Sequence, residues 1–536
     1  MERLKTQDRS MRILVWVGIP FLALIGFVFS TALIGQTTYV AALVVAVGGL
    51  FMFLRSFEQT VVVILLMRSA LDLYSGQQVP AAFAIGVDLL VLFYLGRQLI
   101  LRAPIHTDRF FWVLFGWVLL QATWVALLPT SILGGTPFMT YEAMREWVRF
   151  FSLAMVYLLT MQLRDRISPD RLASLLLLSL VIPLFLAFLQ LNRAVPGFLE
   201  SNVGWKDFEG TGDRINSTLG HYNSFATFSL LFISLSLWRL QMSKRPLGWW
   251  ALIGGLLYCL VATKSLTGLV MLIVFGALYF LPRLKGKGFW GAIALVVTLS
   301  VLLSTELGQS RLVELAKTPL LNPDLSIERA IALQAADITE YRNSFNWRLL
   351  QWRDLLLDWQ RYPLMGYGLA STKELSVFNT TTHNDYIRFL VEEGIIGFSL
   401  FLLFLMAQVV RVLQIIRNSL PGSPQRSLAL VMFPYSVALL VGMMAGNVMV
   451  HTATFFYWWV LLAILGWQWP SEFGATRKAD LVAESSQDLF RAPIVAGYYE
   501  DSFSSDSAEA YDLGFGEASL AENRFMYNDW LPEERN

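Results

Sequence analysis

The sequence is short of the residues that hold metals and disulfides. It contains one cysteine, Cys259, and four histidines, His106, His221, His383 and His451, among 536 residues. A single cysteine excludes an internal disulfide and a thiolate metal cluster. The histidines lie far apart and lack the short spacings that metal sites use. We therefore expect no metal and no cofactor, and we interpret Cys259 as a packing residue within an apolar run.

Charged residues are also scarce. They make up 15% of the chain, whereas hydrophobic residues make up 55% and aromatic residues 14%. So much apolar surface exceeds what one soluble core can bury, which indicates a polytopic membrane protein. The net charge of +1 averages basic loops against an acidic tail. No basic, aromatic-rich patch is present, so we expect no nucleic acid partner.

Apolar segments long enough to cross a bilayer recur along the chain. We predict an all-α, polytopic integral membrane protein with about fourteen transmembrane helices and a large extracytoplasmic loop subdomain. The predicted spans lie at residues 13–34, 39–54, 58–75, 81–97, 110–129, 148–164, 172–192, 222–239, 247–263, 266–283, 288–304, 390–411, 426–447 and 452–469.

Lysine and arginine in the connecting loops predict the orientation. The N-terminus is basic before a first span that lacks a small-residue cleavage site, so we expect that span to be uncleaved and the N-terminus to be inside. Every second loop then carries the basic residues and faces the cytoplasm: Arg55, 97–109, 164–171, 239–245, 282–288 and 411–426. Both termini are predicted to be cytoplasmic.

The remaining loops face the other side, and two of them are long, at 193–221 and 305–389. The second lacks an apolar span for about eighty residues, which predicts a small subdomain. Within it, 343–360 reads as an amphipathic helix that carries Arg348 and Arg353 and suits the headgroup layer. Packing on the loop's own core is the alternative for this helix. Two glycines after it, Gly366 and Gly368, predict a sharp turn.

The stretch from Thr382 to Gly397 returns the chain to the membrane. At helical spacing His383, Ile387, Leu390, Gly394 and Gly397 form one stripe, and Asn384, Arg388 and Glu392 form a polar line. The stretch therefore predicts one helix with two faces. Alternatively, His383 is an interfacial residue and the glycines only permit close helix packing.

The organisation predicted is N-terminal transmembrane helices over 1–200, a catalytic region over 201–469 and a tail over 470–536. The tail is acidic, with serines and glycines between its carboxylates, and buries too little to fold alone. Its tyrosines and Trp530 are candidate binding spots for polysaccharide-assembly partners. A solvated, disordered cytoplasmic tail is the simpler interpretation.

The polar residues predicted outside the membrane combine an anion site with a base. Arg214 lies in the first long loop, Arg348 and Arg353 lie in the second, and His383 lies at the return point. Guanidinium groups bind phosphate oxygens in a fork and stay charged, and a neutral histidine accepts a proton from a sugar hydroxyl. Because nucleotides are absent outside the cell, a lipid-linked pyrophosphate sugar is the donor that fits. Each arginine taken singly is equally well explained as a lipid headgroup anchor.

Three segments, in this order, resemble the O-antigen ligase and polymerase superfamily. They are DRINSTLGHYNSFATF at 213–228, NWRLLQWRDLLLDWQRYPLMGYG at 346–368, and the pattern that begins at His383 and ends at Gly397. The family's motif residues are matched by Arg214, Gly220, Asn223, Ser265, Gly268, Arg348, Pro363, Gly366, Gly368, His383, Asn384, Glu392 and Gly394. The resemblance covers about residues 200–400, and the flanking spans agree by hydropathy.

The resemblance implies an inverting, metal-independent glycosyltransferase of the bacterial inner membrane. Such an enzyme moves a glycan from undecaprenyl pyrophosphate to an acceptor hydroxyl on the periplasmic side, in surface polysaccharide biosynthesis. It implies that His383 is the base, that Arg214 and Arg348 bind the donor pyrophosphate, and that Arg353 is a second candidate for that role.

The resemblance also implies supporting roles for Asn223, Gly366 and Gly394. Asn384 and Glu392 would orient the helix or loop. Arg388 and Glu392, four residues apart, would pair with each other.

Several functions stay open. The acceptor is the lipid A core for a ligase, a second lipid-linked glycan for a polymerase, and a protein hydroxyl for a protein-glycosylating enzyme. A transporter or flippase of lipid-linked glycans is the alternative from another class, and a structural scaffold is a third. Transporters carry ionisable groups near the midplane of two repeats. We see no repeat, and the only such candidates, Arg68 and Asp88, are expected to pair structurally.

Overall fold

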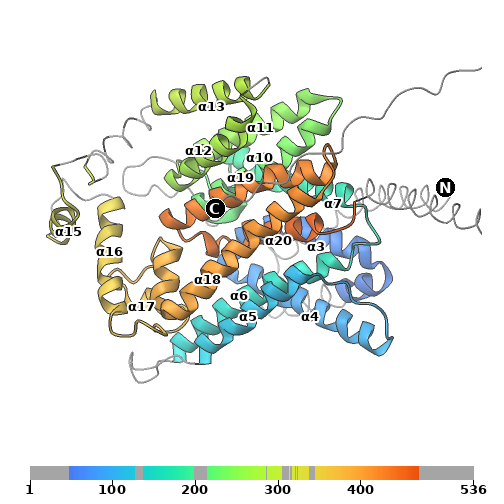
Figure 1. Ribbon diagram of the computed structural model, residues 1–536, viewed down its shortest axis with the longest axis horizontal. Helices are drawn as coiled ribbons and strands as arrows, with labels where there is room; N and C mark the ends of the chain where they lie inside the picture. Colours follow the sequence, from blue (N-terminus) through green and yellow to red (C-terminus); the bar gives the residue numbers. More distant parts are fainter. Residues whose placement is uncertain are drawn as a thin grey trace, which may run out of the picture. The chain divides into compact units, whose positions relative to one another are not determined.

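The computed structural model describes residues 48–126, 137–197, 214–284, 287–304, 324–336 and 344–469, with scattered single positions between these ranges. Every regular element there is a helix (Figure 1). The α-helices are α3 Phe57–Leu71, α4 Val79–Ile100, α5 Arg109–Ala126, α6 Pro137–Met161, α7 Pro169–Leu175, α8 Val181–Leu191, α10 Tyr222–Met242, α11 Pro246–Ala262, α12 Leu266–Phe280, α13 Lys287–Ser304, α15 Ile327–Ala335, α16 Ser344–Trp359, α17 Thr372–Leu375, α18 Asp385–Asn418, α19 Pro424–Ala445 and α20 Thr452–Leu465.

Short 3₁₀ helices join or extend several of these elements. They are η1 Asp72–Gln77, η2 Leu176–Leu180, η3 Ser217–Leu219, η4 Leu281–Arg283 and η6 Val448–Val450. Helices α7, η2 and α8 follow one another directly, so that Pro169–Leu191 is one span in length.

Seven helical stretches of the described residues are long and apolar enough to cross a membrane, and α11 and α20 are shorter apolar helices. The prediction of an all-helical, multi-pass membrane protein is confirmed. The count of about fourteen spans stays a prediction. The predicted first span 13–34 and the acidic tail 470–536 lie outside the described residues.

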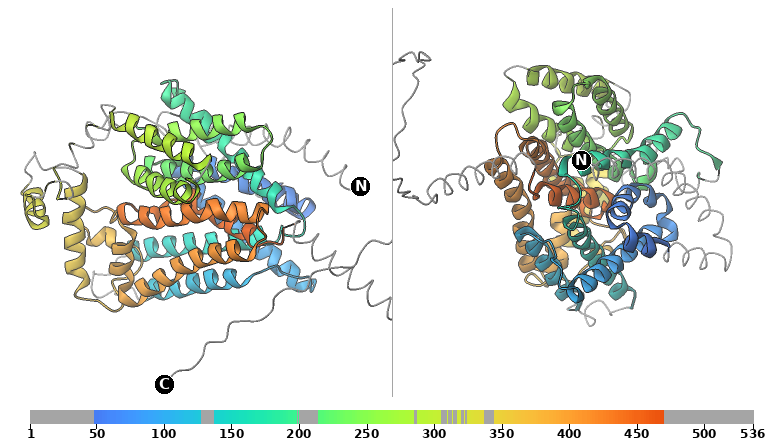
Figure 2. Two further views of the ribbon diagram at one scale, coloured as in Figure 1. Left: turned by 45° about the horizontal axis from the view of Figure 1, so that its top comes forward. Right: turned by 90° about the vertical axis from the view of Figure 1, so that its right-hand side faces the viewer.

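Helices α10 and α20 form the centre of the described bundle. Every side chain from Ala453 to Leu465 in α20 is buried, which a uniformly apolar helix requires. The helices from the C-terminal part, α18 to α20, lie between α10–α13 on one side and α4–α6 on the other (Figure 2). Cys259 of α11 is buried, as expected of a packing residue.

Arg68 and Asp88 do not form the expected pair. Arg68 donates to Asp72 Oδ1 and to Thr452 Oγ1, each at 2.6 Å, and Asp88 accepts from Ser152 Oγ at 2.5 Å. The prediction is wrong because Asp72 lies one helical turn from Arg68 and is reached without tertiary rearrangement.

Helix α18 is broken at Gly394, whose φ of 66° and ψ of −171° lie outside the helical region. The rings of Phe389 and Phe401 stack with centroids 3.8 Å apart, although twelve residues of straight helix rise about 18 Å. Residues 385–393, the short arm of α18, therefore fold back beside residues 395–418, the long arm. The single continuous helix predicted from His383 to Gly397 is wrong, since His383 also lies before the helix and Gly394 reverses it.

Candidate active site

His383 lies in the loop before α18 and is held by its own backbone neighbourhood. Its φ is 53°, in the left-handed region that costs a side-chain-bearing residue about 1–2 kcal/mol. The ring atom Nδ1 lies 2.8 Å from the carbonyl oxygen of Thr381. A carbonyl only accepts, so Nδ1 carries the proton and Nε2 of the neutral ring is left as an acceptor.

The surroundings keep this imidazole neutral. Burial and, to a smaller extent, the nearby positive charge of Arg348 lower the pKa of His383 to about 4, against the hydrogen bond to Thr381. At neutral pH the ring is therefore a proton acceptor beside a permanent cation. This is the combination that removes a hydroxyl proton next to a bound anion.

One face of α16 packs on the loop that carries His383. The Trp347 ring meets the His383 ring edge-on at 5.3 Å. The Trp352 indole donates to the carbonyl of Thr382 at 2.7 Å, and the Gln351 amide donates to Ser376 Oγ at 2.8 Å. The helix predicted over 343–360 is confirmed, and its packing fits the alternative of a helix held on the loop's own core.

This packing separates the two arginines of α16. Arg348 lies on the side of His383, close enough to act on its pKa, whereas Arg353 is exposed. Five helical positions rotate a side chain by about 140° relative to its partner, so the two cannot share a face. The structure thus brings Arg348 and His383 together and leaves Arg353 apart from them.

The break in α18 is braced by residues 363–368, which we call the brace. A helix break leaves backbone groups without partners. Here the brace supplies them through four hydrogen bonds: Tyr367 N to Val391 O (3.1 Å), Gly368 N to Glu392 O (2.7 Å), Ile395 N to Pro363 O (2.8 Å) and Ile396 N to Leu364 O (3.2 Å). The two chain segments act as one unit, and the brace follows directly from α16.

Two glycines permit this close contact. A Cβ on Gly394 would lie 2.2 Å from the carbonyl oxygen of Leu364, and one on Gly366 would lie 2.6 Å from the backbone of Glu392. Both have positive φ, 66° and 71°. Gly368, with φ of 96°, continues the predicted sharp turn.

The short arm is fixed at its start by Asn384 and near its end by Glu392. Asn384 caps the helix, because its Oδ1 accepts from the amides of Tyr386 (3.0 Å) and Ile387 (3.2 Å). Buried Glu392 accepts from Thr372 Oγ1 at 2.6 Å and from Arg388 Nε at 3.2 Å. The expected pairing of Arg388 with Glu392 is confirmed.

Arg388 also joins the short arm to α6. Its Nη2 lies 2.8 Å from Glu146 Oε1, and both side chains are buried. Breaking a buried ion pair by removing one partner costs about 3–5 kcal/mol. The arm that begins two residues after His383 is therefore anchored to the centre of the bundle.

Arg214 lies in the segment before η3, and Asn223 lies in the first turn of α10. The Arg214 guanidinium stands 4.5 Å from the centre of the Tyr222 ring. Asn223 Oδ1 accepts from Ser265 Oγ at 2.5 Å, and the same hydroxyl caps α12 by accepting from the Gly268 amide at 3.0 Å. Gly268 packs directly on α10, since a Cβ there would meet Ala226.

Part of the chain that forms this site matches a known protein family. Residues 250–402 match the family described as O-antigen ligase. This match covers part of the chain and supports the predicted resemblance to the O-antigen ligase and polymerase superfamily. A search of curated proteins found no match. The matched segment contains His383, Arg348 and the brace, whereas Arg214 and Asn223 precede it.

The matched segment also contacts the connection between α19 and α20, which the sequence does not predict. Between α19 and α20, the Asn447 amide donates to Thr381 Oγ1 at 2.7 Å, and the amide of Met449 donates to Asp385 Oδ2 at 3.0 Å. His451 Nδ1 lies 3.0 Å from Thr227 Oγ1 in α10. This connection thus contacts both the His383 loop and the helix that carries Asn223.

The signal in the sequence for this connection is that two polar residues, Asn447 and His451, lie in a short link between two apolar spans. Asn447 was not singled out, and His451 was noted only as an isolated histidine without metal-binding spacing. Among the residues that the structure describes, no three His, Cys, Asp or Glu side chains are arranged to hold a metal ion.

Proposed function

We propose that this protein belongs to the O-antigen ligase family and is an inverting glycosyltransferase that takes its glycan from undecaprenyl pyrophosphate. The acceptor is a hydroxyl on the periplasmic side of the bacterial inner membrane. The protein acts as a surface-polysaccharide ligase or polymerase, with both termini in the cytoplasm. Transfer requires no metal, because arginines take the role of neutralising the pyrophosphate.

One observation carries the proposal. His383 donates from Nδ1 to the Thr381 carbonyl and stands next to Arg348, inside the matched family segment. The ring is neutral at physiological pH, and its second nitrogen is left as the proton acceptor. A neutral base beside a fixed cation suits an acceptor hydroxyl next to an anionic leaving group.

The reaction proceeds in one displacement. The acceptor oxygen forms a bond to the anomeric carbon while the bond from that carbon to the pyrophosphate oxygen breaks. The hydroxyl proton passes to His383 Nε2, and the electron pair leaves with undecaprenyl pyrophosphate. Arg348 binds the charge that develops on that oxygen, and Arg214, with Arg353 as a second candidate, binds the remainder of the pyrophosphate. Because the leaving group is already a stable anion, no general acid is needed.

The remaining predicted residues position the site and do not contact the substrate. Asn384, Glu392, Gly366 and Gly394 hold the short arm and the brace, and Asn223 holds the start of α10 against α12. Effective proton transfer needs the base within hydrogen-bond reach of the hydroxyl. A rigid scaffold is therefore part of the site.

The deciding experiment is transfer by the purified full-length protein with an undecaprenyl-pyrophosphate glycan from the host, with and without a chelator. A ladder of products from donor alone identifies a polymerase, and a single transfer that needs lipid A core identifies a ligase. Both should persist with chelator and disappear in His383→Ala. Donor movement across proteoliposomes without glycan transfer would identify a transporter instead and overturn the proposal.

A further inference from the structure

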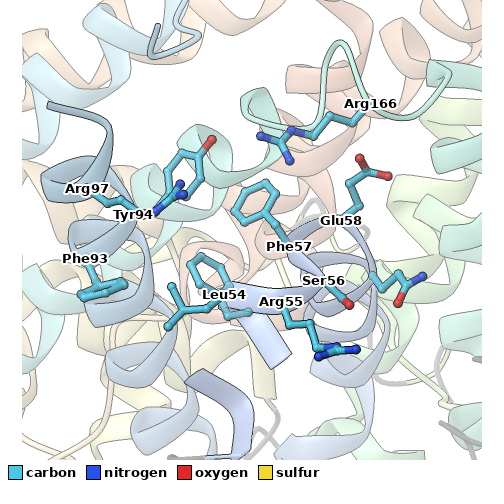
Figure 3. Close-up of a pocket in the computed structure, with 11 residues that line it drawn as sticks. Leu54, Arg55, Ser56, Phe57, Glu58, Phe93, Tyr94, Arg97 and Arg166 are labelled. Atoms are coloured by element: carbon cyan, nitrogen blue, oxygen red, sulfur yellow. The ribbon is translucent and has the colours of Figure 1, made fainter. Parts of the chain in front are cut away.

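A second arginine-rich site lies far from His383. The start of α3 with the residues just before it, the last turns of α4 and the loop after α6 line an open pocket of about 450 Å³ (Figure 3). This volume lies within the range of about 300–1,000 Å³ that small-ligand sites occupy. Its lining combines three arginines, Arg55, Arg97 and Arg166, with one carboxylate, Glu58.

Arg166 is positioned by an aromatic ring rather than by a carboxylate. The Arg166 guanidinium lies 4.8 Å from the centre of the Phe57 ring. That ring is stacked on Tyr94 with centroids 4.5 Å apart. Figure 3 shows Arg166 approaching the rings from one element and Arg97 standing beside Tyr94 on another. No carboxylate in the described part of the chain forms an ion pair with Arg55, Arg97 or Arg166.

Few carboxylates are available to neutralise these arginines. Asp165, next to Arg166, lies 3.3 Å from His106 Nε2. Glu58 is then the one acidic side chain of the lining, against three guanidinium groups. The pocket thus keeps an excess of positive charge that a phosphate group would satisfy.

Apolar side chains complete the lining on one side. Leu54 and Phe93 are exposed and lie together at the same edge of the pocket (Figure 3). A ligand that fits this arrangement carries a phosphate at the arginines and hydrocarbon along the exposed edge. An arginine that only anchors a helix in the headgroup layer needs neither a ring contact nor a pocket beside it.

The pocket is separate from the candidate active site. Glu146 of α6 contacts the short arm of α18, and α6 ends at Met161, about 22 Å further along the helix axis and five residues before Arg166. In Figure 1, α16 and α17 lie at the left and α3 and α7 at the right. Basic loops predict that the pocket faces the cytoplasm.

We propose that this pocket binds the headgroup of an anionic phospholipid of the inner leaflet. Arg97 and Arg166 bind the phosphate oxygens, and Leu54 and Phe93 contact the start of the acyl chains. Anionic headgroups between transmembrane helices are recognised by basic pockets of this kind. The assignment is independent of the glycan transfer proposed above.

The test is equilibrium binding of a fluorescent phosphatidylglycerol analogue to the delipidated, full-length protein in detergent. The variant Arg97→Gln with Arg166→Gln should bind the lipid about tenfold more weakly or worse, since each lost bond is charge-assisted. Arg102→Gln with Arg109→Gln removes the same charge from a neighbouring loop outside the pocket. That control should stay within about twofold of wild type. Equal losses in both pairs would show a general charge effect and overturn the proposal.

Two further arms identify the ligand. A phosphatidylcholine analogue should bind about tenfold more weakly, and equal binding would contradict an anionic headgroup site. Inorganic phosphate that displaces the lipid at equal concentration would assign the pocket to free phosphate instead. Should the double variant fail to fold, Arg166→Lys decides, because it keeps the charge but loses the fork. Wild-type affinity in that variant would then refute the assignment.

Discussion

The His383 site and the pocket by α3 and α4 both present arginines, and the two regions differ in what surrounds those arginines. Near His383 one arginine of α16 stands beside a neutral imidazole whose ring is fixed by a backbone carbonyl. At the pocket by α3 and α4, Arg166 lies over the Phe57 ring, and no histidine is among the lining residues. Guanidinium groups bind anions in both places, but only the first has a proton acceptor. Binding an anion and acting on it therefore need separate residues.

Backbone geometry also differs between the His383 site and the pocket. Of thirteen described residues with positive φ, six lie between Gly366 and Gly394: Gly366, Gly368, Ala370, Asn379, His383 and Gly394. None lines the α3 and α4 pocket. Backbone in sparsely populated conformations persists where surrounding structure over-determines it, which is frequent at functional sites. The concentration of such residues supports His383 as the centre of the chemistry.

Replacing His383 should give the largest effect. His383→Gln keeps a polar side chain but removes the base, so we expect glycan transfer to fall by roughly 10²–10⁴-fold. The pocket variant Arg97→Gln with Arg166→Gln should keep transfer within about threefold of wild type, because it lies at the other end of α6. Initial rates of transfer measure both. Comparable losses of transfer in the two variants would contradict the assignment of catalysis to the His383 site alone.

The pH dependence of kcat/KM tests whether His383 is the base. The free enzyme should lose activity only as pH falls toward 4, because His383 is neutral above its pKa of about 4. A bound pyrophosphate favours the imidazolium, so the acid limb of kcat should lie at higher pH than that of kcat/KM. An acid limb in kcat/KM that persists unchanged in His383→Gln would assign the titration to another group.

Gly394→Ala should damage both stability and transfer. The added Cβ would meet the Leu364 carbonyl at 2.2 Å with φ positive, so we expect a loss of about 2 kcal/mol or more. Thermal unfolding in detergent and transfer rate report the two effects. Gly254→Ala in α11 is the matched control, since its Cβ meets nothing within 4 Å. If Gly394→Ala behaved like that control, the brace would not hold the break in α18.

The two arginines of α16 provide the next comparison. Arg348→Lys should reduce transfer by about tenfold, because a point charge cannot replace the bidentate fork beside His383. Arg353→Lys should change it by less than about twofold, since Arg353 is exposed on another face. The KM for the lipid donor should rise mainly in the first variant. A greater effect at Arg353 would make that residue the pyrophosphate ligand.

Asn447→Leu should give the smallest effect of the series. It removes the donor to Thr381 Oγ1 and so loosens the loop whose carbonyl orients His383. We expect a few-fold loss in kcat from a weakened hydrogen bond of about 1 kcal/mol. The acid limb of the kcat profile should also shift, which a merely structural defect would leave in place. Recovery in Asn447→Gln would support a positioning role, and an unchanged pH profile would argue against it.

Sequence alone predicted much of the helical framework and the chemistry of the site. Long apolar runs indicated the membrane helices because the bilayer selects for length and composition, which are local properties. The amphipathic run at 343–360 placed α16 within a residue or two of its ends. His383, Arg348 and Arg353 were candidates because their side chains carry the needed charge and proton affinity wherever they lie.

Only the tertiary structure decided how these parts meet. A glycine that packs helices and a glycine that reverses one look alike in sequence. The sequence therefore predicts Gly394 within a continuous helix, whereas in the structure the helix reverses there against the brace of residues 363–368. The choice between Arg348 and Arg353 depends on which face of α16 meets the His383 loop. Asn447 acts on Thr381 from a segment 66 residues away in sequence. Contacts between distant segments leave no local periodicity, and for that physical reason they become visible only in the folded chain.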